Sequence, residues 1–115
     1  MPRFVVLSHD WPFPHFDLLL ENQASLLAWR LSAWPPSPQS TPERLPDHRL
    51  LYLDYEGPIS NDRGSVVRID AGQFEWIAPP PPFRVQLASQ HFSGTFDLPP
   101  ANPLPSTPPP SSPNP

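Results

Sequence analysis

The chain has 115 residues, with 22 prolines, no cysteine and a formal net charge of −4 at pH 7. The lack of cysteine excludes a disulfide framework and a thiolate metal site, so any metal must be bound by His, Asp or Glu. Every basic side chain is an arginine, and the acidic balance argues against a broad basic surface that binds duplex nucleic acid regardless of sequence.

The first third of the chain is predicted to form three strands. Residues 3–9 are a β-rich apolar run, residues 22–24 are a turn, and residues 25–31 are a further strand. Residues 15–21 are predicted to form the second of the three strands, in which successive side chains lie on opposite faces. One face carries Phe16, Leu18 and Leu20. The other face carries His15, Asp17, Leu19 and Glu21.

The middle of the chain is predicted to be irregular. Proline and serine mark residues 34–47 as a long surface loop. The segment 48–57 is apolar but short, so we expect a turn or a single helical turn there.

Two hairpins are predicted after this loop. Ala71-Gly72 is a turn signal between the β-rich segments 64–70 and 73–77. Residues 83–87 and 94–98 flank a second turn. Several short strands at close spacing favour a mainly all-β fold, which we expect to be a small antiparallel β-barrel-like domain with short helical turns.

One domain is expected over residues 1–98, followed by a tail over residues 99–115. The tail reads PPANPLPSTPPPSSPNP and has no aromatic or charged side chain, so it cannot bury enough apolar surface to offset the entropy of ordering. We therefore expect a disordered proline-rich tail. No apolar run approaches the roughly 18 residues of a membrane span, and the start of the chain lacks a signal peptide, so a soluble cytoplasmic protein is expected.

Three side chains near the start of the chain suit a metal ion. His15 and Asp17 share one strand face, and imidazole with carboxylate suits a divalent transition metal. His9 ends the preceding strand and returns to the same place if residues 10–14 fold back as a tight connection. An ordinary surface pair is the alternative for His15 and Asp17. A second orienting pair is Asp47-His48.

Five segments in order carry a resemblance to a known family: FVVLSHDWPFPHFDLLLE, LLAW, DHRLLYLDYEGPIS, RGSVVRIDAGQFE and FSGTFDL. Together they resemble the 3′-phosphoesterase domain of bacterial DNA ligase D, also called the DNA polymerase/ligase N-terminal domain. The resemblance covers residues 3–98. The combination of H-D-x4-H-[YF]-D with a later D-H-x3-Y-x2-[FY]-E-G is more specific than either half.

The resemblance implies a Mn²⁺-binding enzyme, or one that uses another divalent transition metal. Such enzymes remove a terminal ribonucleotide from a 3′ end and then the remaining 3′-phosphate. It implies that the metal ligands are His9, His15 and Asp17. It also implies catalytic roles for His48 and Tyr52, which one helical turn would bring to the same side.

The resemblance also indicates one position at which this chain differs from the family in a residue expected to bind phosphate. Family members commonly carry an arginine two residues after the metal-binding aspartate, and this chain has Leu19 there. The candidates to supply the charge are Arg30, Arg44 and Arg49. Arg30 should face opposite to its neighbour Trp29. The residues predicted to bind substrate are Arg30, Arg44 and Glu21.

The function predicted first is a Mn²⁺-dependent 3′-phosphoesterase of DNA repair, acting on DNA or RNA–DNA 3′ ends. We expect a stand-alone protein, because no ligase or polymerase domain follows, and a separate ligase or polymerase as its partner. We also expect a monomer without membrane association. The first alternative is a noncatalytic relative that binds nucleic-acid ends or a partner protein. The second is a non-haem iron oxygenase using His15, Asp17 and His91.

Trp11 and Phe13, in the connection between His9 and His15, could stack on a nucleic-acid base.

Overall fold

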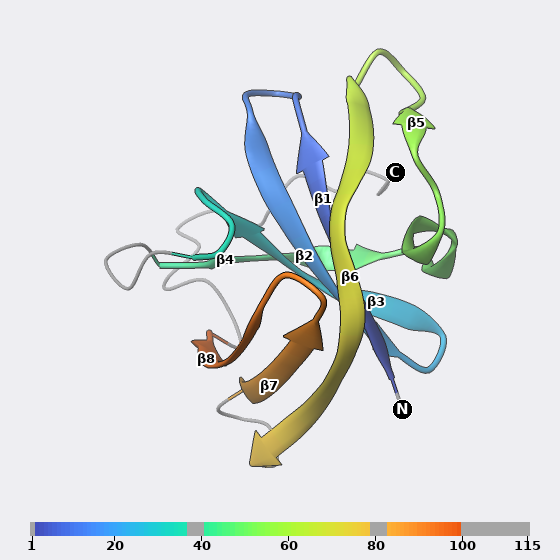
Figure 1. The fold of residues 1–115 in the computed structure, drawn as a ribbon. Helices are drawn as coiled ribbons and strands as arrows, with labels where there is room; N and C mark the ends of the chain where they lie inside the picture. Colours follow the sequence, from blue (N-terminus) through green and yellow to red (C-terminus); the bar gives the residue numbers. More distant parts are fainter. Residues whose placement is uncertain (1, 37–40, 79–82, 100–115) are drawn as a thin grey trace, which may run out of the picture.

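The computed structural model describes residues 2–36, 41–78 and 83–99 (Figure 1). This part of the chain forms one antiparallel sheet that curls into a half barrel, together with one short 3₁₀ helix. The elements are β1 (Arg3–His9), β2 (His15–Asn22), β3 (Ser25–Leu31), β4 (Glu43–His48), η1 (Leu50–Leu53), β5 (Gly57–Pro58), β6 (Ser65–Ala78), β7 (Phe83–Ser89) and β8 (Ser93–Leu98). The strand order is β4-β3-β2-β1-β6-β7-β8, and β5 pairs with β6.

The predicted all-β, barrel-like fold class is confirmed. The first three strands, the helical turn and the β7–β8 hairpin lie where the sequence predicted them. The predicted tail, from residue 100 onward, lies outside the described residues. Within the part of the chain that the structure describes, no helix is long and apolar enough to cross a membrane.

The sheet buries apolar side chains on both of its faces, which follows from the two-residue period of its strands. Leu18 and Leu20 of β2 pack in one cluster with Trp29. Leu19 points the other way and packs in a second cluster, where η1 contributes Tyr52. The segment that contains η1 therefore covers part of the second face and leaves the neighbouring part of that face to a pocket.

The predicted loop over residues 34–47 is wrong at its C-terminal end. Residues Glu43–His48 form β4, which pairs with β3. Pro46 suggested a loop, but β4 is the edge strand of the sheet. An edge strand pairs on one side only, so it tolerates the missing N–H of a proline. Residues 37–40 of the same predicted loop lie outside the described residues.

The predicted hairpin at Ala71-Gly72 is also wrong. β6 runs without a turn through both residues, pairing with β1 along its first half and with β7 along its second half. A Cβ atom on Gly72 would lie 2.0 Å from the carbonyl oxygen of Ala88, so this glycine permits a close approach of β7. The glycine signal was real, but its cause is backbone contact rather than a turn.

Candidate metal centre

The first connection of the sheet brings three ligand-type side chains together. His9 ends β1 and lies directly opposite His15, which begins β2. Asp17 follows two residues later on the same face of β2, and ligand atoms of the three residues lie within 4.8 Å of one another. Their relative exposures are 7%, 5% and 2%, respectively. The structure thus assembles the three side chains that the sequence predicted as metal ligands.

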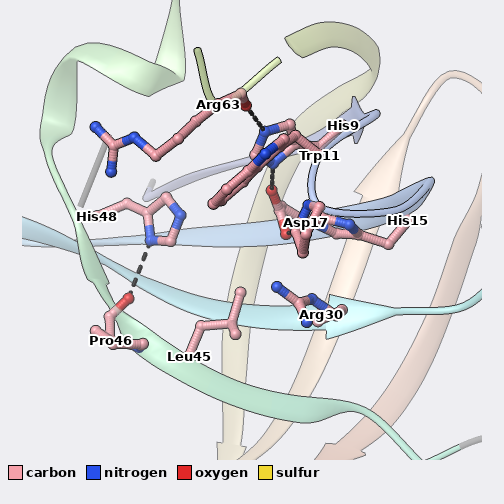
Figure 2. A pocket seen from close by; sticks show the side chains of 10 residues that line it. His9, Trp11, His15, Asp17, Arg30, Leu45, Pro46, His48 and Arg63 are labelled. Carbon is pink, nitrogen blue, oxygen red and sulfur yellow. Dashed lines mark hydrogen bonds and ion pairs between the residues drawn. The ribbon is translucent and has the colours of Figure 1, made fainter. Parts of the chain in front are cut away.

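Backbone carbonyls determine which nitrogen of each imidazole carries the proton. His9 Nε2 lies 2.9 Å from the carbonyl oxygen of Arg63 (Figure 2). His15 Nδ1 lies 2.8 Å from the carbonyl oxygen of Phe13. A carbonyl oxygen only accepts hydrogen bonds, so both of these nitrogens donate. The opposite nitrogens, His9 Nδ1 and His15 Nε2, are therefore unprotonated in the neutral rings.

These unprotonated nitrogens face the Asp17 carboxylate. His9 Nδ1 lies 3.2 Å from Oδ2 and His15 Nε2 lies 3.0 Å from Oδ1. The second contact is not aligned as a hydrogen bond, and among the described residues no group donates one to the buried Oδ1 atom. Two lone pairs and a carboxylate repel one another unless protons or a cation lie among them. The donor set fits a divalent transition metal, with the backbone carbonyls orienting both rings.

Charge interactions favour the ionised form of the Asp17 carboxyl group. Burial favours a neutral Asp17, but the imidazoles of His15 and His9 outweigh it and hold the pKa of the carboxyl well below its usual range. Burial also lowers the pKa of His48, which favours its neutral form. An ionised carboxylate beside neutral imidazoles is the form that binds metal.

The affinity of this cluster for a divalent metal is expected to fall as pH falls. Burial lowers the pKa of His9, but its hydrogen bonds to Asp17 and to the Arg63 carbonyl outweigh burial, so the pKa is raised above its usual value. A proton competes with the metal below that pKa, and the affinity should drop about tenfold per pH unit there and level off above it. Titration calorimetry across roughly pH 5 to 8 measures this dependence. A constant affinity over that range would contradict it.

A pocket of about 150 Å³ opens above the cluster (Figure 2). Its polar lining consists of His9, His15, Asp17, His48, Arg30 and Arg63. Its apolar lining consists of Trp11, Pro12, Leu45 and Pro46. The pocket thus combines metal-ligand groups with two arginines, and this positive charge suits an anionic group such as a phosphate. The guanidinium of Arg63 also donates hydrogen bonds to the carbonyl oxygen and the hydroxyl group of Ser60.

Arg30 reaches the pocket from β3. It lies directly opposite Asp17 in the β2–β3 pairing, on the face away from its buried neighbour Trp29, as the sequence predicted. Its guanidinium lies 5.0 Å from the centroid of the Phe13 ring. The buried Nε atom has no hydrogen-bond partner among the described residues, so this arginine retains a donor for a ligand.

His48 is the last residue of β4 and is buried at the edge of the pocket. Its Nδ1 atom lies 3.0 Å from the carbonyl oxygen of Pro46, and Nδ1 therefore donates, which leaves Nε2 unprotonated in the neutral ring. Tyr52 follows in η1, and its ring lies edge-on to the imidazole with the ring centroids 6.3 Å apart. Tyr52 is buried in the second core cluster and is not part of the pocket lining.

Comparison with protein families decides the identity of the fold. Residues 7–99 match the DNA ligase D 3′-phosphoesterase domain. The chain belongs to this family. A search of curated proteins finds no match to the chain. The metal-ligand cluster and the residues that line the pocket all lie within the matched segment.

Some predicted residues of this phosphoesterase-family domain lie away from the pocket. Glu21 accepts a hydrogen bond from the backbone N–H of Arg3 at 2.9 Å, towards the other end of β2. Arg44 lies 4.7 Å from the centroid of the Trp29 ring and pairs with Asp47 at 3.2 Å. Neither Glu21 nor Arg44 lines the pocket, so their roles in substrate binding stay predictions.

Two further positions bear on the alternatives. His91, the third ligand of the oxygenase alternative, is exposed in the β7–β8 turn and does not line the pocket of the phosphoesterase-family domain. Leu19 shares a sheet face with Asp17 but is fully buried in the second core cluster. The pocket therefore draws its arginines from Arg30 and Arg63 instead of position 19.

Arg63 was not predicted from the sequence. It precedes β6 and lies 54 residues from His9, whose Nε2 atom donates to its carbonyl oxygen. The β1–β6 pairing, with His9 opposite Val66, brings the two segments together. An arginine next to Gly64 in a polar turn was the signal available, but the chain gives no local indication of which strand that turn approaches.

Proposed function

We propose that this protein is a Mn²⁺-dependent 3′-phosphoesterase that processes 3′ ends of DNA or RNA–DNA strands during repair in the cytoplasm. It would remove a terminal ribonucleotide or a 3′-phosphate and act as a monomer before a separate ligase or polymerase. The observation that carries the proposal is the arrangement of His9, His15 and Asp17, whose lone pairs converge below a pocket with two arginines, in a chain of the phosphoesterase family.

In the proposed reaction, some pocket residues would bind the metal and others would bind the phosphate. When bound by His9, His15 and Asp17, the metal would neutralise charge on the phosphoryl oxygens. Arg30 and the guanidinium of Arg63 would attract and orient the phosphate. These contacts supply electrostatic stabilisation without a covalent intermediate on the protein.

His48 is the proposed general base. Its lowered pKa keeps it neutral near pH 7, and the hydrogen bond from Nδ1 to Pro46 leaves Nε2 to accept a proton from the attacking water. Tyr52, which packs edge-on against this ring, would fix its orientation.

An end-processing assay tests the proposal. Purified protein is incubated with Mn²⁺ and primer–template duplexes that end in a 3′-phosphate or in a single ribonucleotide. The expected products are a 3′-hydroxyl end from the first duplex and a shortened primer from the second. His9→Ala should abolish both products, whereas His91→Ala, in an exposed turn, should retain them. Equal activity of the wild type and His9→Ala would refute the proposed site.

Arg30→Gln is expected to lower kcat/KM for a 3′-phosphate end by about ten- to a hundredfold, because a charged hydrogen bond to phosphate is worth roughly 1.5–3 kcal/mol. The matched control is Arg84→Gln, which removes an exposed arginine that pairs with Asp97 at 2.7 Å on β7 and β8. The control should keep wild-type kinetics. Wild-type kcat/KM in Arg30→Gln would remove this residue from substrate binding.

The second candidate is a noncatalytic relative that binds nucleic-acid ends or a partner protein. The observations that favour it are the buried leucine at position 19 and the absence of Tyr52 from the pocket lining. In that case the assay above would give no product from the wild type, while the duplex with a 3′-phosphate would still bind.

A further inference from the structure

We propose that Trp11 is a stacking platform for the base of the terminal nucleotide, so that the pocket selects a base-bearing 3′ end over a bare phosphate ester. The inference rests on the proposed function, because it assigns the phosphate to the pocket. It adds a recognition element that lies outside the metal ligands and the arginines. The element is the aromatic loop that connects His9 to His15.

This loop exposes two large aromatic side chains beside the metal-ligand cluster. Trp11 is 43% exposed and Phe13 is 52% exposed, and they are the only aromatic residues among the exposed large hydrophobic side chains of the described ranges. By contrast, Trp29 is fully buried. Aromatic side chains normally bury most of their area, so the exposure of Trp11, which lines the pocket, suggests a ligand with a planar face.

The size of the pocket places the base outside it. A volume of about 150 Å³ is that of a small cavity, comparable with one that accepts a single benzene ring. A complete nucleotide does not fit in that volume. With the phosphate between Arg30 and Arg63, the sugar and base must leave through the rim, where Trp11 forms part of the lining.

The backbone holds Trp11 in place before any ligand binds. The neighbouring Asp10 accepts a hydrogen bond from the N–H of Ser65 at 2.8 Å. Gly64 lies directly against the loop, because a Cβ atom there would be 2.7 Å from Trp11 Cβ. A fixed platform loses little entropy when a base stacks on it, which favours binding.

Phe13 has a different role in the same loop. Its ring contacts the guanidinium of Arg30, with 5.0 Å to the ring centroid, and the edge of His15, with ring centroids 5.5 Å apart. Through these contacts, Phe13 orients Arg30 and His15, which both line the pocket. Trp11 is therefore the residue assigned to the base.

A binding experiment tests this inference independently of catalysis. Two duplexes are compared, both ending in a 3′-phosphate: one has 2-aminopurine as its terminal base and the other has an abasic terminal residue. Dissociation constants come from the anisotropy of a 5′-fluorescein label, with Mn²⁺ present and with a non-hydrolysable phosphonate in place of each 3′-phosphate so that no turnover occurs. The quenching of 2-aminopurine fluorescence reports stacking directly.

The wild type should bind the base-bearing end about tenfold or more tightly than the abasic end. Trp11→Ala should remove this difference and the quenching, while Trp11→Phe should keep most of both. Ile77→Ala, which shortens an exposed side chain on β6, is the control and should behave as the wild type. Thermal unfolding of Trp11→Ala verifies that the variant folds.

Two results would overturn the inference. One is equal affinity of the wild type for both duplexes. The other is a Trp11→Ala variant that weakens both duplexes by the same factor. A wild type that prefers the base-bearing end but does not hydrolyse the corresponding 3′-phosphate in Mn²⁺ would support the platform and refute the phosphoesterase activity, so the two failures can be distinguished.

Discussion

Asp17→Asn should abolish the Mn²⁺ binding and the 3′-end hydrolysis that we propose for this protein. Asp17 supplies the only carboxylate of the His-His-Asp cluster. An amide carries no charge to offset the metal, and its NH₂ group can donate to the unprotonated nitrogen of His15, which would occupy that ligand. Changes to groups that merely orient metal ligands cost 10- to 100-fold in affinity, so we expect a loss of at least about 100-fold here. Titration calorimetry with Mn²⁺ measures it.

The control for this variant is Asp70→Asn, which changes a second buried aspartate. Asp70 accepts hydrogen bonds from Trp34 Nε1 at 3.0 Å and from Ser89 Oγ at 2.9 Å, and it does not line the pocket above the metal-ligand cluster. Its loss should lower the thermal stability while Mn²⁺ affinity stays near the wild-type value. Mn²⁺ binding by Asp17→Asn within tenfold of wild type would show that the metal lies elsewhere.

Leu19→Arg should destabilise the protein and not increase its activity. Leu19 is fully buried in a cluster with Leu7, Ala28 and Tyr52, so its surroundings are largely apolar. An arginine there would bury a cation in a closely packed apolar cluster, which costs several kcal/mol. We expect the free energy of unfolding to fall by roughly 3 kcal/mol or more, as measured by urea denaturation.

Leu51→Arg provides the matched control for this substitution. Leu51 lies in η1 and is 44% exposed, so an arginine there stays in solvent and should change stability by less than about 0.5 kcal/mol. If Leu19→Arg instead folded as well as the wild type and raised kcat/KM on a 3′-phosphate end, position 19 would be part of the phosphate site, as the family resemblance implies.

The sequence predicted the ligand cluster because the cluster is local. A two-residue period places His15 and Asp17 on one face, and an antiparallel neighbour joined by a short connection returns His9 to the same point. The same period predicted that Arg30 faces away from Trp29. No folding information beyond one strand pair was needed for these inferences.

The sequence mispredicted β4 and the middle of β6 because both depend on which segment lies beside the strand. Pro46 is compatible with β4 only because β4 is at the edge of the sheet. Gly72 looked like a turn, but β7 packs against its backbone. A proline or a glycine in a β-rich segment is compatible either with a loop or turn or with a continuous strand. Which of these forms depends on whether another strand pairs there.

The sequence by itself thus determined the first three strands, the two faces of β2 and the three ligand-type side chains, since these depend on residues close together in the chain. Only the tertiary structure decided which charges reach the pocket. The β1–β6 pairing brings Arg63 to His9, and packing of η1 covers Leu19 while leaving Asp17 at the pocket. Such pairings join segments about 50 residues apart, and their choice depends on the burial of the whole sheet rather than on any local pattern.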